Sequence, residues 1–480
     1  MENKLLNGLM WKFLERFGVQ GVQFVLQIIL ARLLSPEHYG VLSIMVIFVA
    51  LANVFIQNGF NTALMQDKDV REEDYSSVFW VMFAVATILY GVLFISAPII
   101  GQFYNMPSIV LPFRVIALML FPGVINSIQL AKTSRELDFK KVFYGNIGGI
   151  LVSGIVGIVM AYLGAGIWAL VFQTVLNVTI STFVMWFMVH WRLTLHCDFK
   201  RVSKLFSFGW KLLVSSLIDT LYQDLSSLII GKKYSSGTLG YYNRGKQFPQ
   251  FVITAISSTV QSVMLPAMAE KQDEKSNVKH LMRNSIIMSS YLVFPMMAGL
   301  AGVAPTLISL LLTDAWLPCV PYMQIFCVSM AFNPVHACNL QAINAMGRSD
   351  IFLKLEIFKK GIGIIALIIA VVMFESPIAI AMTGVFTMFT SCFINAYPNK
   401  KLIDYSYLEQ LKDYLPSLIA SVCMFLVVFG VGQIECFMIL KLLLQVLVGV
   451  IVYVVLSAIF KLQGFKMSLN VLKGLMSKRK

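Results

Sequence analysis

The chain consists of long apolar runs separated by short polar breaks. A helix needs about 20 predominantly apolar residues to cross a bilayer, and lipid-embedded backbone must satisfy its own hydrogen bonds. The pattern therefore predicts an all-α membrane protein with about fourteen transmembrane helices. The expected spans are residues 8–34, 39–65, 77–104, 109–130, 142–163, 167–189, 205–231, 239–268, 282–312, 321–346, 351–374, 378–398, 414–431 and 437–460.

Composition supports lipid as the solvent of this chain. Of its 480 residues, 58% are hydrophobic and 13% are charged, whereas a soluble domain carries roughly a quarter charged residues. The net charge of +14 could suit nucleic acid, but the basic residues lie in short loops between apolar runs, so we expect no nucleic-acid partner. The seven cysteines form no CxxC pair, and neither a disulfide framework nor a metal site is indicated.

Loop charge predicts the topology. Connections that follow odd-numbered spans carry few basic residues, with Lys232 and Lys233 as the main exception. Connections that follow even-numbered spans are basic, which is typical of cytoplasmic loops and places both termini in the cytoplasm. Their cations include Lys132, Arg135, Lys140, Lys141, Arg192, Lys200, Arg201, Lys204, Lys271, Lys275, Lys279, Arg283, Lys400, Lys401 and Lys412. The N-terminus lacks a cleavable signal pattern, so we expect the first helix to remain as a span.

An internal repeat relates the two halves of the chain. GLMWKFLERF around Trp11 resembles SFGWKLLVSS around Trp210, and SPEHYG ending at Gly40 lines up with SSGTLG ending at Gly240. Internal repeats are common in transporters. We expect a first six-helix bundle at residues 1–200, a second at 201–400, and two additional helices with a basic cytoplasmic tail at 401–480.

Two repeat-related helices carry a polar stripe on one face. In each, polar residues recur at spacings of four, four, three and four, which places them on one line along a helix. In the first span they are Lys12, Arg16, Gln20, Gln23 and Gln27. In the seventh span, 199 residues later, they are Lys211, Ser215, Asp219, Tyr222 and Ser226. A charged group at mid-bilayer is costly, so we expect both stripes to face a partner helix or a watery cavity between the halves.

Each striped residue has a simpler alternative explanation. Lys12 and Lys211 lie near the cytoplasmic ends of their spans and could snorkel to the surface. Glutamines and serines could bond neighbouring helices. Asp219 lies near the middle of its span, where snorkelling is hard, so we favour a functional role for it in ion coupling.

Further charges lie inside the expected spans. Arg114, Arg244 and Lys246 lie toward the outer side of the membrane, and Glu15 and Asp224 accompany the two stripes. Structural ion pairs could account for some of these charges. The excess of cations in the first eight spans nevertheless favours an anionic substrate, since arginine binds phosphate bidentately.

Enzyme signatures are absent from the sequence. There is no GxxxxGK[ST] loop, no HExxH and no G-x-S-x-G elbow, so we expect a transporter that uses no cofactor and is not an enzyme. Of the five histidines only His336 lies deep in a span, where a lone histidine is more often a packing donor than a ligand.

Several segments resemble one family of membrane transporters. The stretch ARLLSPEHYGVLSIMVIFVALANVFIQNGFNTALMQ at 31–66 resembles the opening of Wzx-type polysaccharide transporters of the multidrug/oligosaccharidyl-lipid/polysaccharide exporter superfamily. So do SRELDFKK at 134–141, LGYYNRGKQFPQ at 239–250 and VMLPAMAE at 263–270. The resemblance covers essentially the whole chain and is strongest in the first 270 residues.

The resemblance implies a fold, a substrate and a mechanism. The fold is two pseudo-symmetric six-helix bundles plus two C-terminal helices. The function is a flippase for undecaprenyl-diphosphate-linked oligosaccharide in the bacterial cytoplasmic (inner) membrane. It would serve surface polysaccharide such as O-antigen, lipopolysaccharide, capsule, exopolysaccharide or teichuronic-type polymers by alternating access coupled to an ion gradient.

The partners follow from the same resemblance, and the site residues follow from it together with the polar stripes and the intramembrane charges. The partners are the lipid-linked oligosaccharide and membrane lipid, with a polysaccharide polymerase as a candidate, and we expect function as a monomer. Arg244 in YYNRGKQ matches the family motif directly. The expected substrate-binding residues are Arg16, Arg114, Lys211, Arg244, Lys246, Gln20, Gln23 and Tyr222, and the expected ion-coupling residues are Asp219, Glu15 and Asp224.

Three alternatives remain open on the sequence. A multidrug/cation antiporter of the same superfamily would favour an acidic or aromatic pocket, and a lipid II flippase is a close relative. A membrane polysaccharide polymerase or ligase would place a large hydrophilic loop outside the membrane, and the expected outer connections are only a few residues long.

Overall fold

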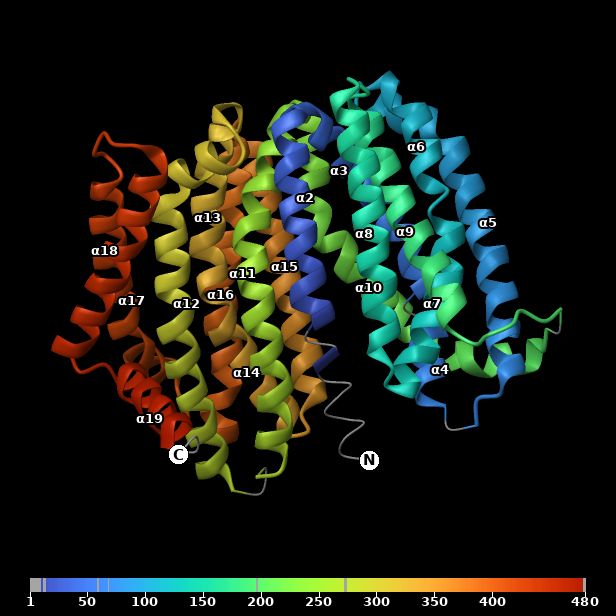
Figure 1. Ribbon diagram of the computed structural model, residues 1–480. Coiled ribbons are helices and arrows are strands. Elements are labelled where there is room, and N and C mark those ends of the chain that lie inside the picture. The colour runs from blue at the N-terminus through green and yellow to red at the C-terminus, as the bar shows by residue number, and fades with distance from the viewer. Residues whose placement is uncertain are drawn as a thin grey trace. The chain divides into compact units, whose positions relative to one another are not determined.

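The computed structural model describes residues 10–11, 14–57, 60–67, 69–195, 197–271 and 274–477. Every regular element within them is a helix (Figure 1). The chain divides into two compact units, Met1–Gly240 and Tyr241–Lys480. The sequence predicted divisions after residues 200 and 400 from the internal repeat, which is a different criterion from compactness. Those repeat boundaries stay a prediction.

The first unit holds the helices up to α10 and the start of α11. Their bounds are η1 Glu15–Val19, α2 Gln20–Leu33, α3 Pro36–Gln57, α4 Phe60–Gln66, α5 Glu72–Phe103, η2 Pro107–Ile109, α6 Val110–Ala117, α7 Leu120–Glu136, α8 Phe139–Tyr162, α9 Ile167–Met188 and α10 Phe199–Lys233. The helices begin and end where local chemistry favours it. Asp198 caps α10 by accepting from the backbone N–H groups of Lys200 and Arg201, and the turn before α9 uses Gly164 and Gly166 at positive φ.

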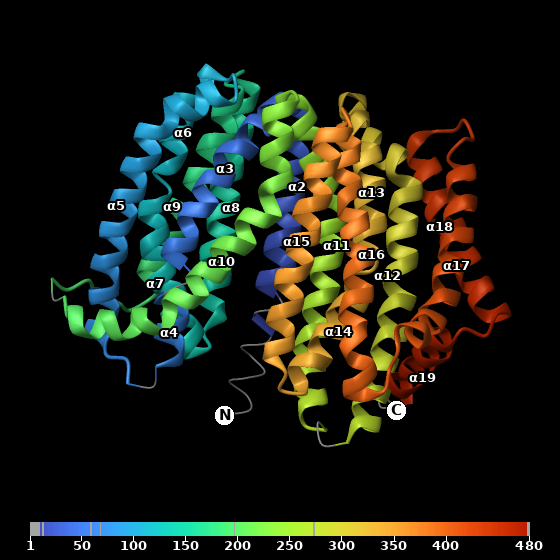
Figure 2. The ribbon, with the colours of Figure 1, turned by 180° about the vertical axis from the view of Figure 1, so that it is seen from behind.

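The second unit holds most of α11 and the remaining helices. Their bounds are α11 Ser236–Ala269, α12 Lys275–Leu311, η3 Asp314–Cys319, α13 Val320–Ala331, α14 Asn333–Ala345, α15 Ser349–Met373, α16 Pro377–Ile403, α17 Tyr407–Val431, α18 Met438–Ile459 and α19 Gln463–Ser477. Figure 2 shows α15 and α16 side by side. A capping box at Ser406 and Glu409 starts α17.

The fold class is that of a multi-pass membrane protein. Ten segments within the described residues are long and apolar enough to cross a membrane, and large apolar side chains such as Leu163, Val372 and Phe437 lie more than 70% exposed, which a lipid environment explains. The expected count of fourteen is not confirmed. The other four expected spans correspond to Glu15–Leu33, α10, α11 and α15, which carry the polar stripes and most of the intramembrane charges.

A broken span occurs at the same place in both halves. In the first, η2 leads into α6, which is separated from α7 at Leu118 and Met119. In the second, η3 leads into α13, which is separated from α14 at Phe332. Interrupted helices at corresponding positions of two halves are typical of repeat-built transporters, so this shared irregularity supports the internal repeat.

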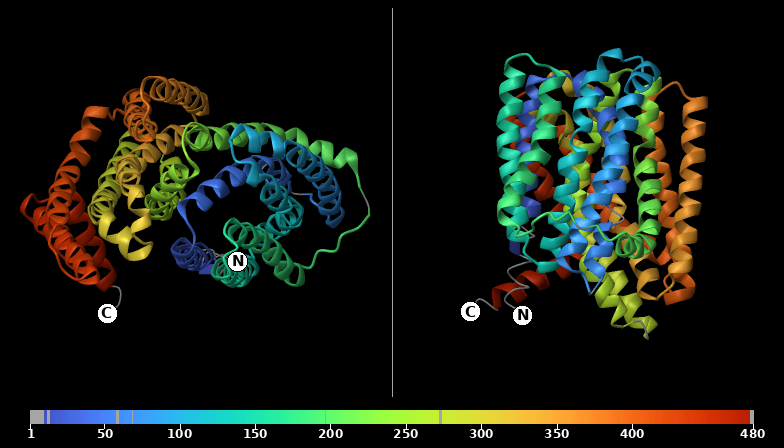
Figure 3. Two further views of the ribbon diagram at one scale, coloured as in Figure 1. Left: turned by 90° about the horizontal axis from the view of Figure 1, so that it is seen from above. Right: turned by 90° about the vertical axis from the view of Figure 1, so that its right-hand side faces the viewer.

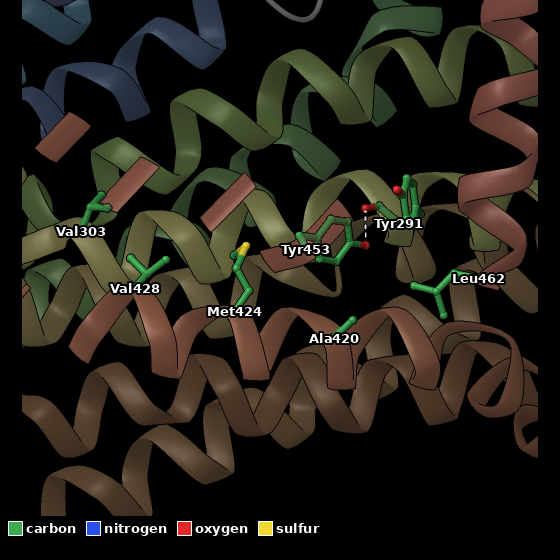
Figure 4. Close-up of a cluster of buried hydrophobic side chains, with 7 residues drawn as sticks. All are labelled: Tyr291, Val303, Ala420, Met424, Val428, Tyr453 and Leu462. Atoms are coloured by element: carbon green, nitrogen blue, oxygen red, sulfur yellow. Dashed lines mark hydrogen bonds between the residues drawn. The ribbon is translucent and has the colours of Figure 1, made fainter. Parts of the chain in front are cut away.

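The two additional helices α17 and α18 pack against α12 in the second unit. Figure 4 shows the buried cluster that joins them, and Figure 3 shows α17 and α18 (red) beside α12 (yellow) from above. The Tyr453 hydroxyl donates to the Tyr291 carbonyl (2.8 Å). A Cβ on Gly302 or on Gly449 would lie 2.9 Å from Val428, so small residues allow the close packing that holds helices together in lipid.

The start of α3 and the start of α11 meet backbone to backbone. A Cβ on Gly40 would lie 1.8 Å from the backbone oxygen of Ser236, and a Cβ on Gly240 would lie 2.1 Å from the backbone oxygen of Pro36. These are the glycines that the repeat aligns, and each contacts the segment that contains the other. The contact is therefore reciprocal, as a local twofold relation requires.

We predict that Gly40→Ala and Gly240→Ala each destabilise the protein by about 2 kcal/mol or more, because the added methyl group overlaps backbone that cannot rotate away. Thermal unfolding of the purified protein in detergent measures the effect. Gly91→Ala is the matched control, since a Cβ there meets nothing within 4 Å and alanine favours the helix by about 1 kcal/mol. Equal melting temperatures for all three variants would contradict the close contact.

Candidate functional site: a polar cavity in the first unit

The first helix contains an irregular turn. Residues Glu15–Val19 form a π-helical turn that leads into α2. In a regular α-helix, residues five apart such as Glu15 and Gln20 point about 140° away from each other. The wider π turn brings them to the same side. Such turns are frequent at functional sites, and the residue spacing alone did not predict this one.

A polar cavity of about 450 Å³ lies beside this turn. The Asn146 amide on α8 donates to Glu15 Oε1 (3.3 Å), and the Ser181 hydroxyl on α9 donates to Asn146 Oδ1 (3.0 Å). Together these bonds fix the direction of the Asn146 side chain. The described lining consists of Glu15, Val19, Gln20, Gln23, Asn146, Ile150 and Asn177.

Glycines on α8 set the walls of this cavity. A Cβ on Gly149 would lie 2.7 Å from the backbone oxygen of Asn177, and a Cβ on Gly154 would lie 2.4 Å from Leu26. Only small residues let α8 approach α9 and α2 so closely. The same helix therefore brings Asn146 and Asn177 within reach of the first helix.

Aromatic packing anchors the start of the first helix to α8. The Trp11 ring lies 5.6 Å from Phe143 and 5.8 Å from Tyr144 between centroids, and Lys140 Nζ lies 5.6 Å above the Trp11 ring. Such aromatic and cation–π pairs stabilise a packed interface. They hold Glu15 over the cavity.

The cavity is suited to a cation or a proton. Glu15 is the one charged group in its described lining, and the other polar groups are carboxamides. Carboxylate and amide oxygens are the ligands that hard cations prefer, and a carboxylate can bind a proton instead. The prediction singled out Glu15, Gln20 and Gln23, and the structure brings these three together. It missed Asn146 and Asn177, whose only signal was an asparagine inside an apolar run.

The predicted residues on α10 lie outside this cavity. Asp219, Tyr222 and Asp224 are partly buried, and Lys211 is exposed. The side chain of Arg16 lies outside the described residues. The roles assigned to these five residues stay predictions.

Arg114 is engaged within the first unit. Its guanidinium lies 3.9 Å from the centroid of the Phe94 ring, and its Nε donates to the Phe94 carbonyl (3.2 Å). The side chain thus joins α6 to α5. Its assignment as a substrate-binding residue stays a prediction.

The YYNRG motif at the start of α11 packs against η3 and α13 in the second unit. A Cβ on Gly245 would lie 2.8 Å from the backbone nitrogen of Met323, and the Tyr242 ring lies 5.2 Å from Phe326. The Arg244 side chain is 5% exposed, donates to Gln247 Oε1 (2.6 Å) and lies 5.1 Å from the centroid of the Trp316 ring.

These contacts give the motif a packing role, because its glycine, tyrosine and arginine all face neighbouring helices. A role of Arg244 in phosphate binding stays a prediction, and so does the role of Lys246, which is partly buried.

The described helices define an all-α, multi-pass membrane fold, and comparison with known proteins defines the family. The model of the polysaccharide biosynthesis protein family matches residues 29–321, which is more than half of the chain. This protein belongs to that family. The expected resemblance to Wzx-type polysaccharide transporters is confirmed by the family match and by the named relatives.

Three relatives carry names from polysaccharide biosynthesis. The teichuronic acid biosynthesis protein TuaB of Bacillus subtilis is 23% identical over 72% of this chain and 72% of its own length. The lipopolysaccharide biosynthesis protein WzxC of Escherichia coli is 22% identical over 77% of this chain and 75% of its own length. The succinoglycan biosynthesis transport protein ExoT of Rhizobium meliloti is 22% identical over 66% of this chain and 65% of its own length.

Solved structures share the fold. The lipid II flippase MurJ in an inward closed conformation matches with a TM-score of 0.75 at 14% identity, over 95% of this chain and 98% of that one. An inward-facing multidrug resistance MATE transporter of the MOP superfamily matches with a TM-score of 0.62 at 15% identity, over 81% of this chain and 98% of that one. The chain therefore has the fold of this transporter superfamily.

We predict that Arg244→Ala lowers the yield of folded protein several-fold, because it leaves the partly buried Gln247 acceptor and the buried Trp316 ring without their cation. Arg244→Lys should retain part of the yield, and Lys246→Ala on the same helix should retain nearly all of it. Size-exclusion chromatography after membrane extraction measures the yield. A fully folded Arg244→Ala protein would show that packing does not require the guanidinium.

Proposed function

We propose that this protein is a flippase that moves undecaprenyl-diphosphate-linked oligosaccharide across the bacterial cytoplasmic membrane by alternating access, with both termini in the cytoplasm. The observation that carries the proposal is the family match together with the fold of a lipid II flippase over 95% of the chain. The relatives' names in teichuronic acid, lipopolysaccharide and succinoglycan biosynthesis support a surface polysaccharide as the destination.

The extent of the structural match favours a lipid-linked substrate over a drug or cation. A match over 95% of the chain leaves too few residues to omit both α17 and α18, whereas the MATE transporter matches 81% of the chain. A lipid II flippase with a different headgroup preference stays the nearer alternative.

Short outer connections weigh against a polymerase or ligase. The connection between α17 and α18 spans residues 432–437, and that between α15 and α16 spans 374–376. Neither leaves room for the hydrophilic loop that such an enzyme would place outside the membrane. A polymerase remains a candidate partner, and function as a monomer remains part of the proposal.

We infer that transport is coupled to an ion gradient through Glu15. Its carboxylate can hold a proton or a small cation together with the amide oxygens of the cavity, and Gln20 and Gln23 line the same space. Asp219 and Asp224 are further candidates for coupling. The cations assigned to substrate binding would contact the diphosphate, since phosphate binding favours arginine and lysine.

The substrate assignment is tested by reconstitution. Liposomes that contain the protein and an undecaprenyl-diphosphate-linked oligosaccharide are treated with a membrane-impermeant enzyme that trims the sugar. We expect the sugar of the inner leaflet to become accessible at least ten times faster than in liposomes with heat-inactivated protein. Equal rates would overturn the proposal, and acceleration with lipid II but not with the oligosaccharide lipid would favour the alternative.

We predict that Glu15→Gln slows this transport at least ten-fold and removes its dependence on a proton or sodium gradient, while the protein level stays normal. Glu15→Asp should keep the dependence at a reduced rate, because it retains the carboxylate. Glu270→Gln is the control, since Glu270 is exposed outside the cavity. Unchanged gradient dependence in Glu15→Gln would assign coupling to another residue.

A further inference from the structure

The helix α19 begins directly after the span formed by α18. α18 ends at Ile459 and α19 begins at Gln463, and Lys461 between them adopts a left-handed φ of 49°. The Leu462 N–H closes this turn on the Ser457 carbonyl (3.0 Å). Figure 1 shows α19 turned away from the axis of α18 and running toward α12. Since α18 is long and apolar enough to cross a membrane, so short a connection places α19 at the membrane surface.

One side of α19 is packed against α12. A Cβ on Gly464 would lie 2.5 Å from the Tyr291 Cβ, and the Ser468 hydroxyl donates to Met288 Sδ (3.6 Å). Leu462, just before the helix, belongs to the same buried cluster as Tyr291 (Figure 4). These contacts hold α19 in a fixed orientation on the second unit.

The opposite side of α19 is polar. Gln463, Lys466, Asn470 and Lys473 recur at spacings of three, four and three, which places them on one face of the helix. All four are exposed. Two residues correspond to about 200° of rotation around a helix, so Gly464 lies on the side away from Lys466. Packing of Gly464 on α12 therefore turns the polar face away from the second unit.

The segment 461–480 is strongly cationic. It contains no aspartate or glutamate, and its cations are Lys461, Lys466, Lys473, Lys478, Arg479 and Lys480. Within the described residues, Lys461, Lys466 and Lys473 form no ion pair, whereas Lys279 on α12 pairs with Glu409 (3.1 Å). A basic cytoplasmic loop needs cations for its topology, but topology does not require them on one face of a packed helix.

Apolar side chains lie exposed beside these cations. Leu469, three residues after Lys466, is 39% exposed, and Phe460, next to Lys461, is 64% exposed. This combination is typical of interfacial helices, whose cations reach lipid headgroups while apolar side chains enter the acyl boundary. An acidic protein would match the charge but would not account for the apolar side chains at the membrane surface. Lipid is therefore the better match for this face.

We propose that α19 binds the headgroups of anionic phospholipids, with Lys466 and Lys473 as the contacting cations. The predicted topology places α19 at the cytoplasmic leaflet, whose negative surface potential attracts cations next to a span. Because α19 is packed on α12, lipid bound there restrains the end of α12 as well. The binding itself does not depend on the proposed function, and only the choice of leaflet depends on the topology.

Hydrogen–deuterium exchange of the full-length protein in nanodiscs, without substrate, tests the proposal. Discs of phosphatidylcholine are compared with discs of equal parts phosphatidylcholine and phosphatidylglycerol at low salt. We expect the amides of α19 to exchange at least five-fold more slowly in the anionic discs, because cations held at an anionic surface oppose local opening. High salt should abolish most of this difference, since it screens exposed charges.

Charge variants identify the contacting side chains. Lys466→Gln combined with Lys473→Gln should remove the slowing, whereas Lys466→Arg combined with Lys473→Arg should retain it. The matched control combines Lys271→Gln with Lys275→Gln, which removes the same charge from the exposed connection between α11 and α12. Each control lysine has a glutamate beside it in the sequence, so the control should leave the slowing intact. Exchange of α12 in phosphatidylcholine discs, equal to that of the unaltered protein, verifies that each variant is folded.

Equal exchange of α19 in the two kinds of disc would overturn the proposal and would favour an acidic protein partner for this face. Slowing that survives in the double glutamine variant would also overturn it, because Lys466 and Lys473 would then not carry the contact. Loss of the slowing in the control variant would contradict a site on α19. Because the discs contain no substrate, failure of the flippase assay leaves these results unaffected.

Discussion

Lipid offers no hydrogen bonds, so each polar group inside a span must find its partner within the protein. This constraint explains the arrangement of the polar side chains in both units. Glu15 accepts from Asn146, which in turn accepts from Ser181. Arg114 covers the Phe94 ring and bonds its carbonyl. Polar side chains that line a space within the spans are then confined to few places. The cavity beside Glu15 is one of these places.

Satisfying these groups requires helices to approach closely, and small residues make that possible. Gly149 allows α8 to reach Asn177 on α9, and Gly245 allows α11 to reach the backbone of α13. Gly40 and Gly240 do the same for two segments that the internal repeat relates. Dispersion between packed backbones therefore holds the fold together, since burial from lipid provides little hydrophobic driving force.

Much of the fold could be predicted from the sequence, because lipid imposes a length and a composition on each span. The gaps between the expected spans 142–163 and 167–189, and between 351–374 and 378–398, lie at the junctions of α8 with α9 and of α15 with α16. The cavity was harder to predict. Asn146 lies 131 residues from Glu15 in the chain, and a π turn, which residue spacing does not reveal, directs Glu15 toward Gln20. The buried hydrogen bonds that join Asn339 to Gln410 and Asn399 were missed for the same reason, because they link different helices.

The cationic residues show why charge alone cannot locate a substrate site. Lys132 bonds Glu72 and the carbonyl of His190, and Arg201 is paired with Asp67 and Asp74. These cations stabilise loops that the predicted topology places on one side of the membrane. An excess of positive charge therefore reflects orientation and internal pairing as well as ligand binding. The case for an anionic lipid-linked substrate consequently depends on the family and on the fold.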